Sequence, residues 1–154
     1  MTAPLPFTLK VPGMDTVSGA DVSSTSYRFH GLLRFDGHSL HLEWAGTADI
    51  DEVSGLDVRS ETVALPTETL SLPVHRLRSA VLRAGWWRPH LELTGSDLAA
   101  LAIVPGEQLG RLRLWLARDD REHARRVVEG LREAIATPLL DEGDAPPPTP
   151  PGRS

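Results

Sequence analysis

Two histidines and a glutamate stand close together in the sequence, at His30, His41 and Glu43. Imidazole and carboxylate groups are common ligands of transition metals. If residues 27–45 form a hairpin that turns at Asp36-Gly37, His30 faces Glu43 directly and His41 lies diagonal to it. An ordinary solvated strand face with a histidine–glutamate pair has the same pattern. Because no second shell is visible in the sequence, we expect no metal site and no cofactor.

Other patterns that would indicate catalysis are weak. Asp49, Asp51 and Glu52 form an acidic cluster, but the spacing of a calcium-binding loop is missing, so a solvated loop explains them better. The sequence contains no nucleophile elbow, phosphate-binding loop or dinucleotide fingerprint. It also contains no cysteine. We therefore expect no enzyme activity and no catalytic residues.

Arginine and tryptophan residues in the second half of the chain form the strongest candidate binding surface. If the strands there are neighbours, their outer side gathers Arg76, Arg78, Trp86, Arg88, His90, Arg111, Arg113 and Trp115. Tryptophan and arginine are enriched where protein interfaces carry their binding energy. In the alternative, a tryptophan packs under another segment and the arginines pair with Glu92 and other acids. The expected partner-binding residues are Trp86, Arg88, Arg111, Arg113 and Trp115.

The charge of the chain argues against nucleic acids and anionic membranes as partners. The formal net charge is −5, whereas nonspecific binding to polyanions favours basic proteins. No stretch approaches the ~18 apolar residues of a membrane-spanning helix, and no signal-peptide pattern is present. We therefore expect a cytoplasmic protein without integral membrane association. Its partner would be a protein or peptide, or a second copy in a homodimer.

The clearest local structure in the sequence is the hairpin of residues 27–45. Asp36-Gly37 suits a two-residue turn, which sets Phe35 opposite His38 and leaves one face of the ribbon apolar. The polar segment 46–68 reads as a loop with short β-like pieces. The hairpin is therefore the expected framework for His30 and its neighbours.

Later strands and one helix complete the predicted core. Residues 69–83 read as one strand bent at Pro73, and residues 110–117 as another. Between them, the buried side of a half-exposed strand is expected to hold Trp87, Pro89, Leu91 and Leu93. An amphipathic helix is expected over residues 120–136. Its apolar stripe is Ala124, Val127, Val128, Leu131 and Ile135.

Strands in meander order followed by one amphipathic helix resemble the pleckstrin-homology-like (PH-like) superfold, and most closely its bacterial domains. The residues that carry the resemblance are Leu70-Ser-Leu-Pro73, Leu77, Val81, the following glycine turn and Leu91-Glu-Leu93. The resemblance implies an α+β, mainly β fold. In that fold a strongly bent antiparallel sheet or small barrel is capped by one C-terminal amphipathic helix.

The basic loop of lipid-binding PH domains has no counterpart in this sequence. Those domains place a lysine and several arginines around a long first hairpin loop. The corresponding loop here is Asp36-Gly37, with only Arg28 and Arg34 nearby. A phosphoinositide is therefore not an expected ligand.

Three segments divide the chain in this interpretation. Residues 1–26 form an N-terminal arm or an edge strand, residues 27–136 the PH-like domain, and residues 137–154 a disordered acidic and proline-rich tail. The expected function is a noncatalytic PH-like interaction module that binds a protein or peptide or self-associates. The alternative is a small-ligand-binding barrel or an uncharacterised hydrolase. The ligand barrel is disfavoured if the core is filled by Phe29, Trp44, Leu91, Leu114 and Leu131.

Overall fold

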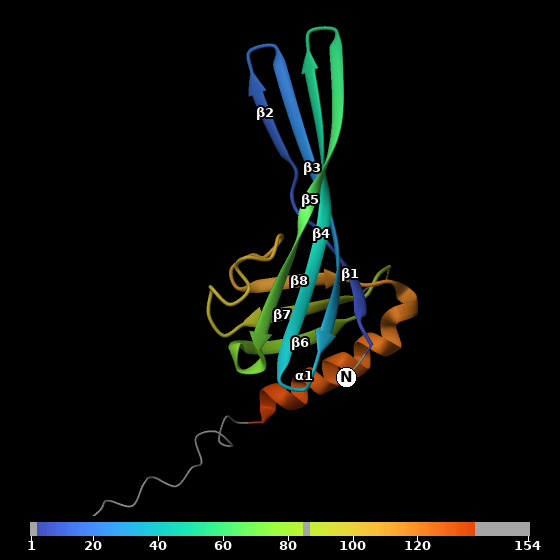
Figure 1. The fold of residues 1–154 in the computed structure, drawn as a ribbon, viewed down its shortest axis with the longest axis vertical. Coiled ribbons are helices and arrows are strands. Elements are labelled where there is room, and N and C mark those ends of the chain that lie inside the picture. Colours follow the sequence, from blue (N-terminus) through green and yellow to red (C-terminus); the bar gives the residue numbers. More distant parts are fainter. Residues whose placement is uncertain (1–2, 85–86, 138–154) are drawn as a thin grey trace, which may run out of the picture.

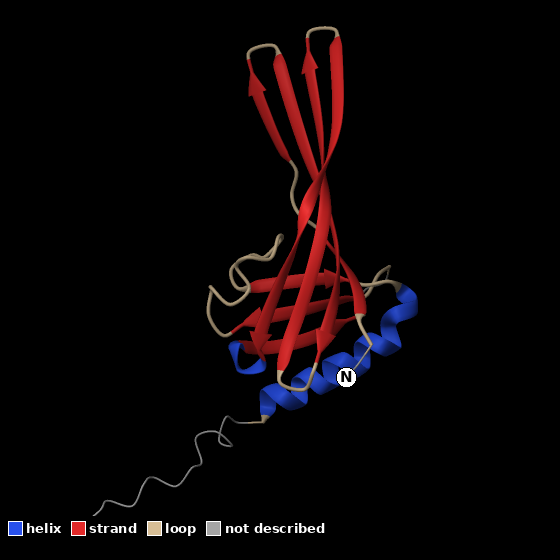
Figure 2. Cartoon of the chain, in the orientation of Figure 1, coloured by secondary structure: helices blue, strands red, loops and turns tan. Residues whose placement is uncertain are grey.

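A computed structural model describes residues 3–84 and 87–137, which form a mainly β structure with one C-terminal helix (Figures 1 and 2). The strands are β1 (Leu5–Leu9), β2 (Met14–Ser18), β3 (Asp21–Phe35), β4 (Ser39–Ser54), β5 (Asp57–Pro73), β6 (Leu77–Arg83), β7 (His90–Gly95) and β8 (Arg111–Trp115). A 3-10 turn η1 (Val74–Arg76) separates β5 from β6, and η2 (Arg118–Asp120) leads into the helix α1 (Arg121–Ala136). The expected fold class is confirmed.

One open antiparallel sheet contains all the strands. Its order is β5-β4-β3-β1-β8-β7-β6, and β2 pairs with β3 beside this path. The sheet bends so strongly that β6, β7 and β8 run across β3, β4 and β5 (Figure 2). α1 packs against β6 and η1 and lies across one end of the structure (Figure 1). The sheet is therefore bent and capped by the helix, as expected, without closing into a barrel.

Alternating apolar residues place the core inside the bend. Leu112 and Leu114 of β8 are buried while Arg111 and Arg113, which alternate with them, are exposed, as the period of a strand requires. α1 buries Ala124, Val127, Val128 and Leu131 of the predicted stripe, and Ile135 at its end is partly buried. Each fully buried leucine contributes about 1.5–3 kcal/mol of transfer free energy. The core therefore supplies the main driving force for folding.

Within the N-terminal segment β2 pairs with β3 alone and is an edge strand, whereas β1 differs from the expectation. β1 lies between β3 and β8, so it is an interior strand and neither an edge strand nor a loose arm. Leu5, Phe7 and Leu9 alternate along it and are all buried. That burial explains why the strand occupies the interior of the sheet. The predicted disordered tail lies, apart from Thr137, outside the described residues.

The predicted two-residue turn at Asp36-Gly37 is wrong by two positions of register. Phe35 pairs with Leu40 instead of His38, so His38 lies in the loop. The Asp36 carboxylate accepts hydrogen bonds from the backbone N–H groups of His38 (2.8 Å) and Ser39 (2.7 Å), which stabilises the longer loop. Because the shift is even, the apolar face of the ribbon is preserved.

The predictions for residues 46–68 and 69–83 contain correct β segments, but the extent of these strands and their connection are wrong. Residues 46–68 belong to long, continuous strands in β4 and β5, joined by a tight turn at Gly55. The predicted bent strand splits at Pro73: β5 and β6 lie at opposite edges of the sheet and η1 joins them. Polar composition did not prevent strand formation, because backbone pairing with two neighbours supports β4 along its whole length.

Trp87 departs from the predicted buried side of its strand. Its side chain is 73% exposed, whereas Pro89, Leu91 and Leu93 are buried as expected. The reason is local, because β7 begins only at His90 and the alternation does not extend to Trp87.

The outer parts of β3, β4 and β5, together with β2, extend beyond the core as a continuation of the same sheet (Figure 1). We call residues 14–26 and 49–62 the projecting sheet; they belong to β2, β3, β4 and β5. None of these residues is buried. The projecting sheet thus exposes both of its faces to solvent.

Candidate functional site

The outer side of β8 and its neighbours forms the candidate site. Trp115 pairs with His90 of β7 on one side and with Thr8 of β1 on the other, so the three side chains lie in one row across the sheet. Arg111 and Arg113 precede Trp115 on the same side of β8. We call the surface made by Lys10, Arg88, His90, Arg111, Arg113 and Trp115 the Trp115 face.

Two ring contacts hold Trp115 in place. The Lys10 ammonium nitrogen lies 3.7 Å from the centroid of its ring, which is the geometry of a cation–π interaction. The His90 ring lies 4.7 Å from Trp115, centroid to centroid, with a tilt of 39°. Trp115 is consequently half-buried and presents its remaining surface among cations.

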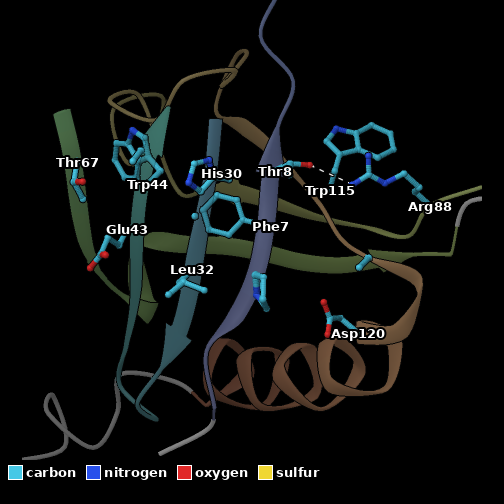
Figure 3. Close-up of a pocket in the computed structure, with 14 residues that line it drawn as sticks. Phe7, Thr8, His30, Leu32, Glu43, Trp44, Thr67, Arg88, Trp115 and Asp120 are labelled. Carbon is cyan, nitrogen blue, oxygen red and sulfur yellow. Dashed lines mark hydrogen bonds between the residues drawn. The ribbon is translucent and has the colours of Figure 1, made fainter. Parts of the chain in front are cut away.

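An open groove lies on one side of Trp115 (Figure 3). Its volume is about 480 Å³, and its lining includes Thr8, His30, Arg88, Trp115 and Asp120. The Arg88 guanidinium donates a long hydrogen bond of 3.4 Å to the Thr8 hydroxyl. Figure 3 shows Arg88 extending toward Trp115 and Thr8. The groove therefore has an aromatic wall with a cation at its rim.

Trp115 also lines a second, more basic hollow. It has a volume of about 510 Å³ and is lined by Lys10, Arg111, Arg113, Leu109 and Trp115, among others. Leu109 is 87% exposed there. Trp115 thus lines both a groove of mixed charge and a cationic hollow.

The arginines of this surface differ in how far their charge is neutralised. Glu92, whose side chain is only 13% exposed, lies 3.7 Å from Arg113 and 3.6 Å from Arg83. In the described part of the chain, Lys10, Arg88 and Arg111 have no carboxylate within ion-pair distance. Arg76 is held by Asp97 at 3.2 Å and adds no free charge. The Trp115 face therefore carries net positive charge.

The pKa of His90 depends on the burial and the charges of this surface. Partial burial lowers the pKa of its imidazole below the ordinary 6.5, and the Arg113 guanidinium lowers that pKa further, whereas Glu92 raises it. The Nδ1 atom of His90 is buried without a hydrogen-bond partner among the described residues. A neutral ring against Trp115 is consistent with this environment.

The metal site considered at His30, His41 and Glu43 does not assemble. The changed register pairs His30 with Ala45 instead of Glu43. His41 instead contacts the Asp36 carboxylate through Nε2 (2.8 Å) and the Ser71 hydroxyl through Nδ1 (2.9 Å). Within residues 3–84 and 87–137, no group of three or more His, Cys, Asp or Glu side chains is placed to hold a metal ion.

Ser71, His41 and Asp36 nevertheless form a hydrogen-bonded chain of the kind found in serine hydrolases. The two ring nitrogens are used in the opposite sense to that of the hydrolases, because Nδ1 faces the serine and Nε2 faces the carboxylate. The same carboxylate also holds the β3–β4 loop through two backbone N–H groups. Hydrogen bonds from His41, Ser39 and His38 keep the pKa of Asp36 well below its ordinary value. The chain therefore has a structural explanation as a staple of the loop.

The structure brings four of the five predicted partner-binding residues to one region, namely Arg88, Arg111, Arg113 and Trp115. Trp86 lies outside the described residues. Sequence reasoning missed Thr8 and Lys10, because β1 was not expected in the interior beside β8. The alternation of Leu5, Phe7 and Leu9 was the signal that could have found them.

No helix in the described ranges has the length and apolar character needed to cross a bilayer. Comparison with family models, with curated proteins and with solved structures found no match to this chain. Any function must therefore be argued from the geometry of the site itself.

Proposed function

We propose that this chain is a noncatalytic PH-like interaction module whose Trp115 face binds an acidic segment of a protein or peptide. The two antiparallel meanders β3-β4-β5 and β6-β7-β8 and the capping helix support the PH-like resemblance. The observation that carries the binding proposal is a half-exposed tryptophan that is held among cations and lines a groove and a basic hollow. Aromatic and arginine side chains in such a setting are typical anchors of interfaces.

The chemistry of the surface supports an acidic partner with apolar side chains. Lys10, Arg88 and Arg111 have no acidic neighbours within ion-pair distance among residues 3–84 and 87–137, so they can pair with carboxylates of a partner. Trp115 and Leu109 offer apolar surface between them. A partner that supplies both kinds of group would neutralise the cations and cover the apolar surface together.

The interior of the bend does not favour the alternative of a small-ligand barrel. Trp44, Leu91, Leu114 and Leu131 are at most 1% exposed, and Phe29 packs against them. These side chains fill the space between sheet and helix that an internal ligand would need. The hollows beside Trp115 are surface features instead.

A labelled peptide of alternating glutamate and valine tests the proposal by fluorescence anisotropy. We expect Trp115→Ala to weaken binding at least about tenfold, as for an interface anchor, and we expect binding to weaken as salt is raised. Arg126→Gln, on an exposed position of α1, is the matched control and should bind like wild type. The proposal is overturned if a Trp115→Ala/Arg113→Ala double variant binds the peptide as wild type does.

The Ser71–His41–Asp36 chain supports a hydrolase as the second candidate function. Turnover of a p-nitrophenyl ester that is lost in Ser71→Ala, with folding unchanged, would support this activity. Equal background rates for wild type and Ser71→Ala would leave the chain its structural role alone.

A further inference from the structure

The projecting sheet ends in two hairpins of nearly identical sequence. Val17-Ser-Gly-Ala-Asp-Val22 joins β2 to β3, and Val53-Ser-Gly-Leu-Asp-Val58 joins β4 to β5. The first turn residue is Gly19 in one hairpin and Gly55 in the other, with φ of 63° and 62°. A positive φ at this position is what a two-residue type II′ turn requires. Because β3 pairs with β4, the two tips belong to one sheet and lie side by side (Figure 1).

The repeat gathers four valines in one row on one side of the projecting sheet. Val17 pairs with Val22, Val22 with Val53, and Val53 with Val58. Their exposed fractions are 69%, 39%, 37% and 68% in chain order. The next row on the same side is Asp15, Ser24, Asp51 and Ser60. We call these two rows the valine face; exposed apolar rows of this kind typically mark contact surfaces.

The projecting sheet and the Trp115 face are complementary in charge. The projecting sheet carries seven carboxylates against one arginine, Arg59. The carboxylates are Asp15, Asp21, Asp49, Asp51, Glu52, Asp57 and Glu61. Of these, Asp49 is already held by Arg28 at 3.1 Å. Like charge opposes the stacking of two projecting sheets, whereas the Trp115 face offers cations with exposed apolar surface between them.

The four valines and Trp115 of one chain lie far apart. Asp21, which adjoins Val22 at the tip, and His30 in the core region belong to the single strand β3, which separates them by about 30 Å. His30 pairs with Thr8, and Thr8 pairs with Trp115, so Trp115 lies level with His30 across the sheet. A contact between the four valines and Trp115 is therefore intermolecular.

We propose that the valine face of one copy of this chain docks on the Trp115 face of a second copy. In this arrangement the valines cover Trp115 and Leu109, and the Asp15 and Asp51 carboxylates pair with Arg111 and Arg113. The inference rests on the proposed function, because it names the acidic and apolar segment that the Trp115 face binds. It also gives the duplicated hairpin sequence a role, since the apolar row is complete only with both hairpins.

Charge-reversal variants of the full chain test this contact by light scattering and sedimentation equilibrium. One variant carries Asp15→Lys and Asp51→Lys, the other Arg111→Glu and Arg113→Glu. We expect wild type to self-associate at low salt and each variant alone to associate at least about tenfold more weakly, because like charges then face each other. An equimolar mixture of the two variants should associate again, because each supplies the surface that the other has lost.

Charge changes on the helix α1 serve as matched controls. Glu129→Lys and Arg126→Glu on exposed positions of α1 should leave the association unchanged. Circular dichroism of each variant verifies that its fold is intact. The inference is overturned if wild type stays monomeric, if the Arg111→Glu/Arg113→Glu variant associates like wild type, or if the mixture stays monomeric.

The acidic peptide separates failure of this inference from failure of the proposed function. The Asp15→Lys/Asp51→Lys variant keeps an intact Trp115 face, so its affinity for the glutamate–valine peptide reports on that face alone. Peptide binding by this variant, with a monomeric wild type, overturns the self-docking inference and leaves the proposed function standing. Absence of peptide binding in both proteins overturns the proposed function.

Discussion

β3, β4 and β5 each run through two regions of the molecule with opposite patterns of burial. In the core region, alternate residues are buried, as with Leu40, Leu42 and Trp44 on β4. In the projecting sheet the same strands bury nothing, and their register continues without interruption on β3 and β4. Backbone hydrogen bonds are therefore sufficient to continue a strand whose fold is secured elsewhere, but apolar burial holds only the core region together.

The difference in burial also separates a region that stabilises the fold from a region that presents an exposed surface. The projecting sheet buries no residue, and it exposes four valines at its tip. The core region buries its leucines, whereas the valines at the tip of the projecting sheet are exposed and are the contact surface in the proposed self-docking. The following variants test how cleanly stability and contact divide between the two regions.

The largest effect is expected from Leu114→Ala on β8. Leu114 is fully buried, so truncation should cost about 2–5 kcal/mol of unfolding free energy through lost transfer and a cavity. Val53→Thr in the projecting sheet keeps β-branching and should stay within about 0.5 kcal/mol of wild type. Urea denaturation of both variants measures the contrast. Equal losses would show that the projecting sheet shares the core.

Gly31→Ala should give the next largest loss. A Cβ at Gly31 would lie against the Glu43 carbonyl oxygen and 2.6 Å from the Phe7 ring. Overpacking of this kind costs about 1–3 kcal/mol. At Gly19 an added Cβ meets nothing within 4 Å, so Gly19→Ala should cost only the strain of its positive φ, about 1 kcal/mol. Thermal unfolding of the two variants compares them, and a larger loss at Gly19 would contradict the packing argument.

The β3–β4 loop should make stability depend on acid pH through Asp36. The folded-state pKa of Asp36 lies below the ordinary 3.8. The stability that its charged carboxylate contributes is therefore present above that pH and is lost as pH falls below it. Asp36→Asn removes the charged acceptor and should be less stable than wild type at neutral pH. The difference should shrink below about pH 4, which denaturant midpoints across the acid range can follow. A difference that stays constant with pH would contradict the assignment.

The smallest effect concerns His90 on the Trp115 face. Because burial lowers its pKa below the ordinary 6.5, the unfolded chain binds a proton first as pH falls, and stability decreases through that range. An NMR titration of His90 should show a midpoint below 6.5, and Arg113→Gln should raise it toward the ordinary value. Arg126→Gln should leave the midpoint where it is in wild type. A higher midpoint in the wild type would mean that the surface is not cationic around this ring.

Local patterns in the sequence were sufficient for much of the core. The alternation of Leu91 with Leu93 and of Leu112 with Leu114 predicted buried strand faces, and the stripe from Ala124 to Leu131 predicted the helix. The strand assignment also put Arg111, Arg113 and Trp115 on one outer face. These features follow from the periods of strands and helices, which are properties of neighbouring residues alone.

These local patterns did not predict which strands pair when they are distant in the sequence. The interior position of β1, and with it the place of Lys10 over Trp115, depends on which strands meet. The length of β4 and β5 also depends on it, because their polar outer halves are held by neighbours and not by burial. The duplicated Val-Ser-Gly-x-Asp-Val segments are visible in the sequence, but only the register of the sheet shows that they align four valines in one row. The sequence by itself determined the alternation of buried and exposed residues within elements such as β8 and α1, since side-chain period is local. The tertiary structure decided where each element begins and ends, as at Trp87, and which exposed residues stand together, since strand order is not local.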